Sequence, residues 1–202
     1  MSEFLVSTKE QNNPKLLSGS SSNLVTTTGG KLAPNFIGEQ FLRLYLDGET
    51  GALLPISQLT EVLNISCSQV MPIPHMHPWI MGVYNWRGEI LWLVDLAHLV
   101  GITPMYQQAL TSANYTVVVL EGAEEDSMEN ERKAVGLVIN QVGNIESCNP
   151  DLIKDISSAS IDSKLEAFLR GYWCKSDYEM LAVFQLDAIW EAMSQEETNS
   201  QF

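Results

Sequence analysis

Histidines are the residues of this sequence whose type and spacing could support catalysis or metal binding. His75 and His77 form an H-x-H pair, as metal ligands can, but prolines flank the pair and no acidic residue or cysteine lies near it. His98 falls in a segment predicted to be a short helix, where packing or solvation explains a histidine without catalysis. Gly-x-Ser-x-Gly, P-loop and Gly-x-Gly-x-x-Gly motifs are absent from the sequence. We therefore expect no catalytic, metal-binding or cofactor-binding residues; an enzyme built on the histidine pair is the alternative.

One arginine stands out by its position. Between Phe36 and Glu131 the only lysine or arginine residues are Arg43 and Arg87, in a chain of formal net charge -14. Arg87 and Gly88 lie between two runs of strand-forming residues. A β-turn with a solvated arginine is the plain interpretation, because glycine adopts turn conformations that other residues disfavour. The alternative is a recognition point on a rigid scaffold, since Arg and Trp are enriched at the energetic centres of protein interfaces.

Two of the five tryptophans, Trp86 and Trp92, lie close to Arg87 in the sequence. In a strand, Trp92 shares a face with Ile90 and Val94, so its burial depends on which face meets the core. If exposed, the two tryptophans would extend an interface; if buried, they would hold the arginine in place. The tryptophans also leave open a pocket for a small aromatic or anionic ligand.

Composition restricts the classes of partner. A pI near 4.4 disfavours nucleic acid and anionic lipid as partners, and it points to proteins instead. The three cysteines are far apart and form no C-x-x-C pair, which indicates a reducing compartment. The sequence shows no signal peptide and no apolar window of about 18 residues for a membrane span. We expect a cytoplasmic protein without direct membrane insertion.

The segments differ in composition. Residues 1–35 are rich in Ser, Thr, Asn and Gly and predict a flexible leader, because they offer too little apolar surface to offset the entropy of ordering. Six carboxylates between Glu121 and Glu131 predict an acidic loop. Short strand-like runs follow one another from Phe41 onward, at residues 41–46, 52–56, 69–73, 83–86, 90–94, 115–120, 134–139, 168–173 and 180–186.

Helices are expected to be few and short. Ser57, Asp95 and Asp187 are candidate N-caps, and the helical segments are predicted at residues 57–63, 78–81, 96–100 and 188–193. Strands at short spacing, joined by turns, predict mainly antiparallel sheet curled into small barrels. Because each half of the sequence ends on an apolar strand followed by an Asp-capped helix, we expect two similar β subdomains.

The stretch from Pro78 to Leu96 carries a more specific pattern, Pro-x-x-x-Gly-Val-x-Asn-x-Arg-Gly-x-Ile-x-x-Leu-x-Asp-Leu. This pattern resembles the signature region of the CheW-like family, which comprises adaptor proteins of bacterial chemotaxis and regulatory domains of their histidine kinases. The resemblance extends over residues 36–193. It implies a mainly β fold of two SH3-like five-stranded antiparallel β-barrel subdomains with short helices around a shared core, followed by a tail at residues 194–202.

The resemblance also implies a function. Such proteins are non-enzymatic adaptors without cofactors that couple the cytoplasmic tip of a methyl-accepting chemoreceptor to the CheW-like domain of a CheA-type histidine kinase. The chain is short enough to be the stand-alone adaptor type. It would then lie in the cytoplasm, associated with receptor arrays at the inner membrane. A small-ligand-binding module with the same β fold is the alternative.

By this resemblance, the signature arginine of the family corresponds to Arg87. The residues that we expect to contact receptor or kinase are Asn85, Trp86, Arg87, Gly88, Glu89 and Trp92. The sequence departs from the family pattern in having Trp92 where proline is usual, Trp86 where an aliphatic residue is common, and Asn140 where aspartate is frequent. The bulky aromatic residues are similar to those of adaptors in the phototaxis or type IV pilus (twitching motility) systems of cyanobacteria.

Overall fold

A computed structural model describes residues 38–108, 113–123, 132–155 and 163–199. The chain divides into two units, residues 1–35 and 36–202, and all described residues belong to the second. The predicted flexible leader, and residues 124–131 of the predicted acidic loop, lie outside the described residues.

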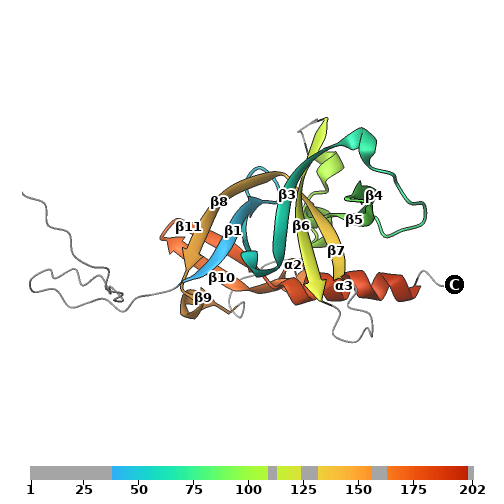
Figure 1. The fold of residues 1–202 in the computed structure, drawn as a ribbon. Helices are drawn as coiled ribbons and strands as arrows, with labels where there is room; N and C mark the ends of the chain where they lie inside the picture. The colour runs from blue at the N-terminus through green and yellow to red at the C-terminus, as the bar shows by residue number, and fades with distance from the viewer. Residues whose placement is uncertain (1–37, 109–112, 124–131, 156–162, 200–202) are drawn as a thin grey trace, which may run out of the picture. The chain divides into compact units, whose positions relative to one another are not determined.

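The described residues form two β-sheets (Figure 1). The first sheet has six strands in the order β8-β1-β2-β11-β10-β9. The strands of this sheet are β1 (Glu39–Tyr45), β2 (Gly51–Pro55), β8 (Gln141–Cys148), β9 (Ile153–Lys154), β10 (Leu169–Ser176) and β11 (Glu179–Phe184). The second sheet has five strands in the order β3-β6-β7-β5-β4. Its strands are β3 (Leu59–Ser66), β4 (Ile80–Trp86), β5 (Glu89–Asp95), β6 (Asn114–Ala123) and β7 (Arg132–Ile139).

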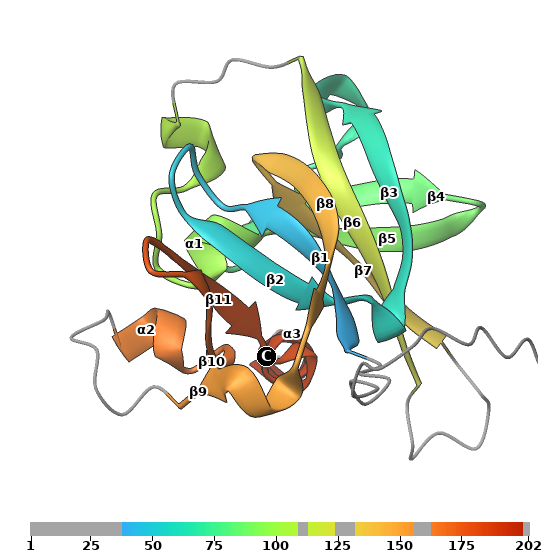
Figure 2. The same ribbon diagram turned by 90° about the vertical axis from the view of Figure 1, so that its left-hand side faces the viewer.

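The helices are short apart from the last one. Their bounds are α1 (Leu96–Leu99), α2 (Ser163–Glu166) and α3 (Leu186–Asn199), with single 3₁₀ turns η1 (Ile56–Gln58), η2 (Cys67–Gln69), η3 (Met105–Gln107) and η4 (Pro150–Leu152). Figure 2 shows α3 nearly end-on below the strands. The prediction of a mainly β protein with two sheets is therefore confirmed.

The two sheets do not correspond to the two halves of the sequence. The first sheet combines the N-terminal hairpin β1–β2 with the C-terminal strands β8 to β11, and the second sheet is built from the middle of the chain. The first sheet has six strands where five were expected. Pairing is mainly antiparallel, but β11 runs parallel to β2 and β5 runs parallel to β7.

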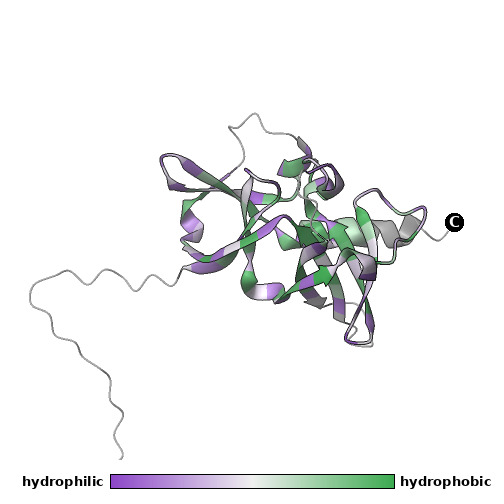
Figure 3. Ribbon diagram, turned by 90° about the horizontal axis from the view of Figure 1, so that it is seen from above, coloured by the Kyte–Doolittle hydropathy of each residue, from purple (hydrophilic) through white to green (hydrophobic). Residues whose placement is uncertain are grey.

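Both faces of both sheets bury apolar side chains, which gather in three clusters. One face of the first sheet carries Phe41 and Val183, and one face of the second carries Leu91 and Val117. The largest cluster joins the opposite faces of the two sheets to α3, through residues that include Leu44, Leu54, Val118, Leu137, Phe184 and Ile189. Figure 3 shows hydrophobic residues along the strands and hydrophilic residues at hairpin ends. Each sheet thus has its own small core, and a larger core lies between them.

The predicted helix at residues 57–63 is wrong. Ser57 lies in the 3₁₀ turn η1, and Leu59 begins the strand β3, which pairs along its length with β6. Leu63 and Ile65 both contribute to the core of the second sheet. Their spacing of two residues is a strand period, and the hydrogen-bonded partner strand prevails over a weak helical pattern.

Three other local predictions need correction. The expected helical turn at residues 78–81 is absent, since Ile80 already belongs to β4. The expected extended piece at residues 69–73 contains only an isolated bridge between Met71 and Val83. The last helix begins at Leu186, so Asp187 lies inside its first turn, and the helix continues to Asn199.

The predicted Asp95 cap is confirmed. Asp95 ends β5, is 2% exposed, and is the one buried polar or charged residue in the part of the chain that the structure describes. Its carboxylate accepts hydrogen bonds from the backbone N–H of His98 at 3.1 Å and of Met105 at 2.7 Å. It therefore ties α1 and η3 to the end of β5, which is the strand that leaves the Arg87 turn.

We predict that Asp95→Ala lowers the free energy of unfolding by about 1–3 kcal/mol, because two backbone N–H groups lose a buried acceptor. Asp95→Asn should cost less, since it retains one acceptor oxygen. The measurement is urea denaturation followed by circular dichroism. Asp187→Ala is the control, because Asp187 is exposed in the first turn of α3 and its loss should cost about 0.5 kcal/mol. Equal losses for Asp95→Ala and Asp187→Ala would contradict the role of Asp95.

Candidate functional site

The turn between β4 and β5 is a two-residue hairpin that holds Arg87 at its tip. Trp86 and Glu89 are paired across it, leaving Arg87 and Gly88 as the loop. Their φ angles are 56° and 92°, the positive values of a type I′ turn. Arg87 thus occupies a left-handed conformation in which asparagine or glycine is the usual residue. The Asn85 side chain supports the turn by accepting a hydrogen bond from the Gly88 N–H at 3.1 Å.

The guanidinium of Arg87 is held by two neighbours. Its Nη2 atom lies 2.9 Å from Oε1 of Glu61, and its Cζ atom lies 4.9 Å from the centroid of the Trp86 ring. The Arg87 side chain is nevertheless 64% exposed. A guanidinium has five N–H donors in a planar fork, so most of them are left to face solvent or a partner.

Glu61 connects this hairpin to the far edge of its sheet. The Oε1 atom that pairs with Arg87 also accepts a hydrogen bond from Nε1 of Trp86 at 2.5 Å. Glu61 lies on β3 and Trp86 on β4, which are the two outermost strands of the five-stranded sheet. The sheet must therefore curl strongly enough to bring its edges together. The Trp86 ring is 7% exposed and packs in the core of this sheet, so it is an anchor rather than part of the outer surface.

The two arginines of residues 36–131 have different environments. Arg43 lies on β1, is only 17% exposed, and pairs with Glu179 on β11 at 2.6 Å and with Glu146 on β8 at 3.8 Å. Burial alone would lower the pKa of Arg43, but the hydrogen bond and charge of Glu179 outweigh this effect and raise the pKa. Arg43 is therefore a structural cation inside the first sheet, and Arg87 is the exposed one.

The structure brings together only part of the predicted site. Asn85, Trp86, Arg87 and Gly88 meet at the hairpin tip, and Glu89 is exposed beside them. Trp92 lies on β5, and its side chain is on the opposite face of the sheet from that of Trp86 on β4. Trp92 is partly buried there, near α3.

Glu61 is not among the predicted site residues, because it falls in the segment 57–63 that the sequence predicts as a short helix. The β-branched residues Thr60, Val62 and Ile65 around it were the signal for a strand.

His75 and His77 are not part of a larger cluster of possible metal ligands within the described residues. Among the described residues, no group of three or more His, Cys, Asp or Glu side chains is arranged to hold a metal ion. His77 instead stacks on Trp79, with ring centroids 5.3 Å apart. The rings of His98 and Tyr106 lie edge to face, with their centroids 6.2 Å apart. No helix among the described residues is long and apolar enough to cross a membrane.

Comparisons with known proteins agree on one family. The family model described as "CheW-like domain" matches residues 40–193. A curated relative from Rhizobium etli, described as "Probable chemotaxis protein CheW", is 25% identical over 159 residues, which are 79% of this chain and 92% of the relative. Among solved structures, the scaffolding protein TtCheW from Thermoanaerobacter tengcongensis matches with a TM-score of 0.56 and 21% identity, over 73% of this chain and 89% of that one. This last similarity confirms the predicted fold of two SH3-like subdomains.

We predict that Glu61→Ala lowers the free energy of unfolding by about 1–3 kcal/mol, because the buried indole N–H of Trp86 loses its acceptor. Urea denaturation followed by tryptophan fluorescence measures this. Glu49→Ala, at an exposed position of the β1–β2 turn, is the control and should change stability by less than about 0.5 kcal/mol. A Glu61→Ala protein as stable as the wild type would show that the hydrogen bond contributes nothing net.

We predict that Arg87→Gly changes the free energy of unfolding by less than about 1 kcal/mol. Glycine adopts the positive φ without strain, and this gain offsets the loss of an exposed ion pair and a cation–π contact. Thermal and urea denaturation of the purified variant measure the effect. A loss well above this value would mean that Arg87 is retained for stability.

Proposed function

The chain belongs to the CheW-like family, and we propose that it couples a methyl-accepting chemoreceptor to a CheA-type histidine kinase through the exposed hairpin that carries Arg87. Proteins of this family are non-enzymatic scaffolds of chemotaxis signalling, and this chain is one of them. The receptor, the kinase and the contact residues are the part that we propose.

The position of Arg87 is the observation that supports this proposal. The residue occupies a strained backbone conformation, with φ of 56°, and its side chain is 64% exposed. Neither feature benefits stability, because exposed ion pairs contribute little and a non-glycine residue at positive φ is disfavoured. Backbone strain that stability does not explain is found most often at functional sites.

The surroundings of Arg87 suit recognition of a protein. The Glu61 carboxylate and the Trp86 ring fix the guanidinium in one orientation, so little side-chain entropy is lost when a partner binds. Its free N–H groups can bind a carboxylate or backbone carbonyls of a helical receptor tip. Asn85, Gly88 and Glu89 form the adjoining surface of the turn.

We further propose that the protein lies in the cytoplasm at receptor arrays by the inner membrane. Phototaxis or type IV pilus motility is the output that we propose, on the strength of the bulky residues Trp86 and Trp92. Deletion of the gene should then abolish directed motility toward light or on surfaces, and undisturbed directed motility would contradict the assignment.

We predict that Arg87→Glu weakens the ternary complex with receptor and kinase by at least about thirtyfold, the effect of losing an interface hot spot. The measurement is titration calorimetry with the CheW-like domain of a kinase encoded beside this gene, with and without a receptor fragment. Arg87→Lys, which retains the charge but lacks the planar fork, should have an intermediate effect.

Lys154→Glu is the matched control, since it makes the same charge change at an exposed position of β9 in the other sheet. Far-UV circular dichroism of each variant establishes that it is folded. A folded Arg87→Glu protein that binds both partners as tightly as Lys154→Glu does would rule out the role of Arg87, while leaving membership of the family intact.

A further inference from the structure

The exposed guanidinium of Arg87 lies among carboxylates, and this restricts the chemical group that it can receive from a partner. Trp86 and Glu89 are direct partners across the hairpin, so their side chains leave the same face of the sheet. Arg87 lies over the Trp86 ring and against Glu61, which places its guanidinium on this face too. We call Glu61, Arg87 and Glu89 the hairpin charge cluster.

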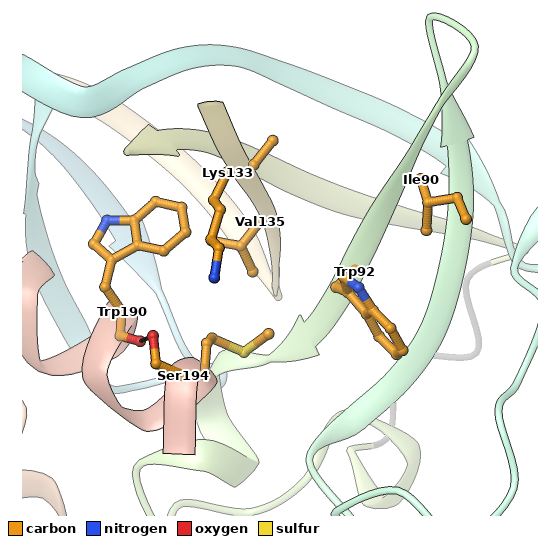
Figure 4. A pocket seen from close by; sticks show the side chains of 8 residues that line it. Ile90, Trp92, Lys133, Val135, Trp190 and Ser194 are labelled. Carbon is orange, nitrogen blue, oxygen red and sulfur yellow. Dashed lines mark hydrogen bonds between the residues drawn. The ribbon is translucent and has the colours of Figure 1, made fainter. Parts of the chain in front are cut away.

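The charged groups of this hairpin lie on one face only. Ile90 and Trp92 belong to the other face of β5, where they line a pocket beside α3 (Figure 4). Asn85 is the cross-strand partner of Ile90, and its side chain bonds the turn itself. A partner that meets Arg87 therefore also meets the carboxylates of the hairpin charge cluster.

The hairpin charge cluster holds two carboxylates against one guanidinium, so its net charge is negative. The Glu61 carboxylate, with a side chain that is 27% exposed, already neutralises Arg87 at 2.9 Å. The whole chain carries a formal net charge of -14. A partner carboxylate placed on Arg87 would be repelled by Glu61 and Glu89, because salt screens charges only beyond about 8 Å at physiological ionic strength.

A neutral acceptor avoids this repulsion, and the C-terminal end of an α-helix supplies several. The last four carbonyl groups of a helix have no partner within the helix, and they carry the negative end of the helix dipole. Lysine and arginine are favoured in the last turn for the same reason. Such an end presents acceptors beside cations, which complements the donors beside carboxylates in the hairpin charge cluster.

We propose that Arg87 binds carbonyl oxygens at the C-terminal end of a partner helix, while Glu61 and Glu89 receive lysine or arginine side chains from its last turn. This inference rests on the proposed function, since it names the chemistry of the partner that the hairpin binds. The planar fork of an arginine can reach two carbonyl groups at once. The bonds of Glu61 to Trp86 and Arg87 both end on Oε1, so Oε2 can accept a bond from the partner.

A charge reversal at Glu89 tests this proposal through the sign of its effect. Titration calorimetry measures binding of the full chain to the CheW-like domain of a kinase encoded beside this gene, and separately to a receptor fragment. For the partner whose affinity Arg87→Glu lowers, Glu89→Lys should weaken binding at least about tenfold, and Glu89→Gln about threefold. Glu49→Lys makes the same charge change in the exposed β1–β2 turn and should alter the affinity less than about twofold. Circular dichroism establishes that each variant is folded.

Double-mutant cycles separate a carbonyl acceptor from a side-chain acceptor. Alanine replaces each exposed Asp, Glu, Asn and Gln of that partner in turn, and none should couple to Arg87→Ala by more than about twofold, because the acceptors belong to the main chain. A lysine or arginine in the last turn of a partner helix should couple to Glu89→Gln by more than about twofold.

The proposal is overturned if Glu89→Lys strengthens binding or leaves it unchanged, or if a carboxylate or amide side chain of the partner couples to Arg87 beyond twofold. It is also overturned if the cation that couples to Glu89 lies outside the last turn of a helix. If Arg87→Glu lowers neither affinity, the proposed function itself fails, and this inference fails with it.

Discussion

Burial on both faces of both sheets is the constraint on which the rest of this structure depends. A strand such as β6 carries Val117 on one face and Val118 on the other, and both are completely buried. Such a sheet needs a cover on each side. The chain satisfies this need by curling each sheet around a small core of its own and packing the remaining faces together with α3. Hairpin ends, such as the turn that carries Arg87, then remain exposed.

Curling brings strands from opposite sides of each sheet within reach of each other, and in both sheets a carboxylate on an edge strand bridges them, to the other edge strand in the second sheet and to β10, next to the edge strand β9, in the first. In the second sheet, Glu61 on β3 binds Trp86 and Arg87 at the end of β4. In the first sheet, Glu146 on β8 accepts a hydrogen bond from Lys175 on β10 at 2.6 Å and lies near Arg43. The first bridge leaves its arginine exposed, and the second encloses its arginine within the sheet. The same kind of bridge thus leaves an exposed arginine in one sheet and a largely buried arginine in the other.

Local patterns in the sequence predicted much of this arrangement. The Arg87 hairpin, the Asp95 cap and the strands β6 and β7 follow from turn chemistry, capping and β-branched runs, which act over a few residues. The strand β3 was missed because its residues also fit a helical spacing, and only its pairing with β6 decides between the two. Glu61 was missed with it. Parallel pairing of β2 with β11 depends on residues 130 positions apart, such as Ala52 and Ala182, and no local signal reports it.

The first sheet combines strands from both ends of the described chain, and this order has a consequence for folding during synthesis on the ribosome. The strands β3 to β7 of the second sheet are continuous in the sequence, so they can pair as soon as they emerge. The hairpin β1–β2 emerges before the other described strands, yet its neighbours β8 and β11 are translated only after all strands of the second sheet. The β1 edge of this hairpin stays open until β8 has left the exit tunnel, and the β2 edge stays open until β11 has left it; open strand edges favour aggregation. The part of the protein that is made earliest is therefore completed latest.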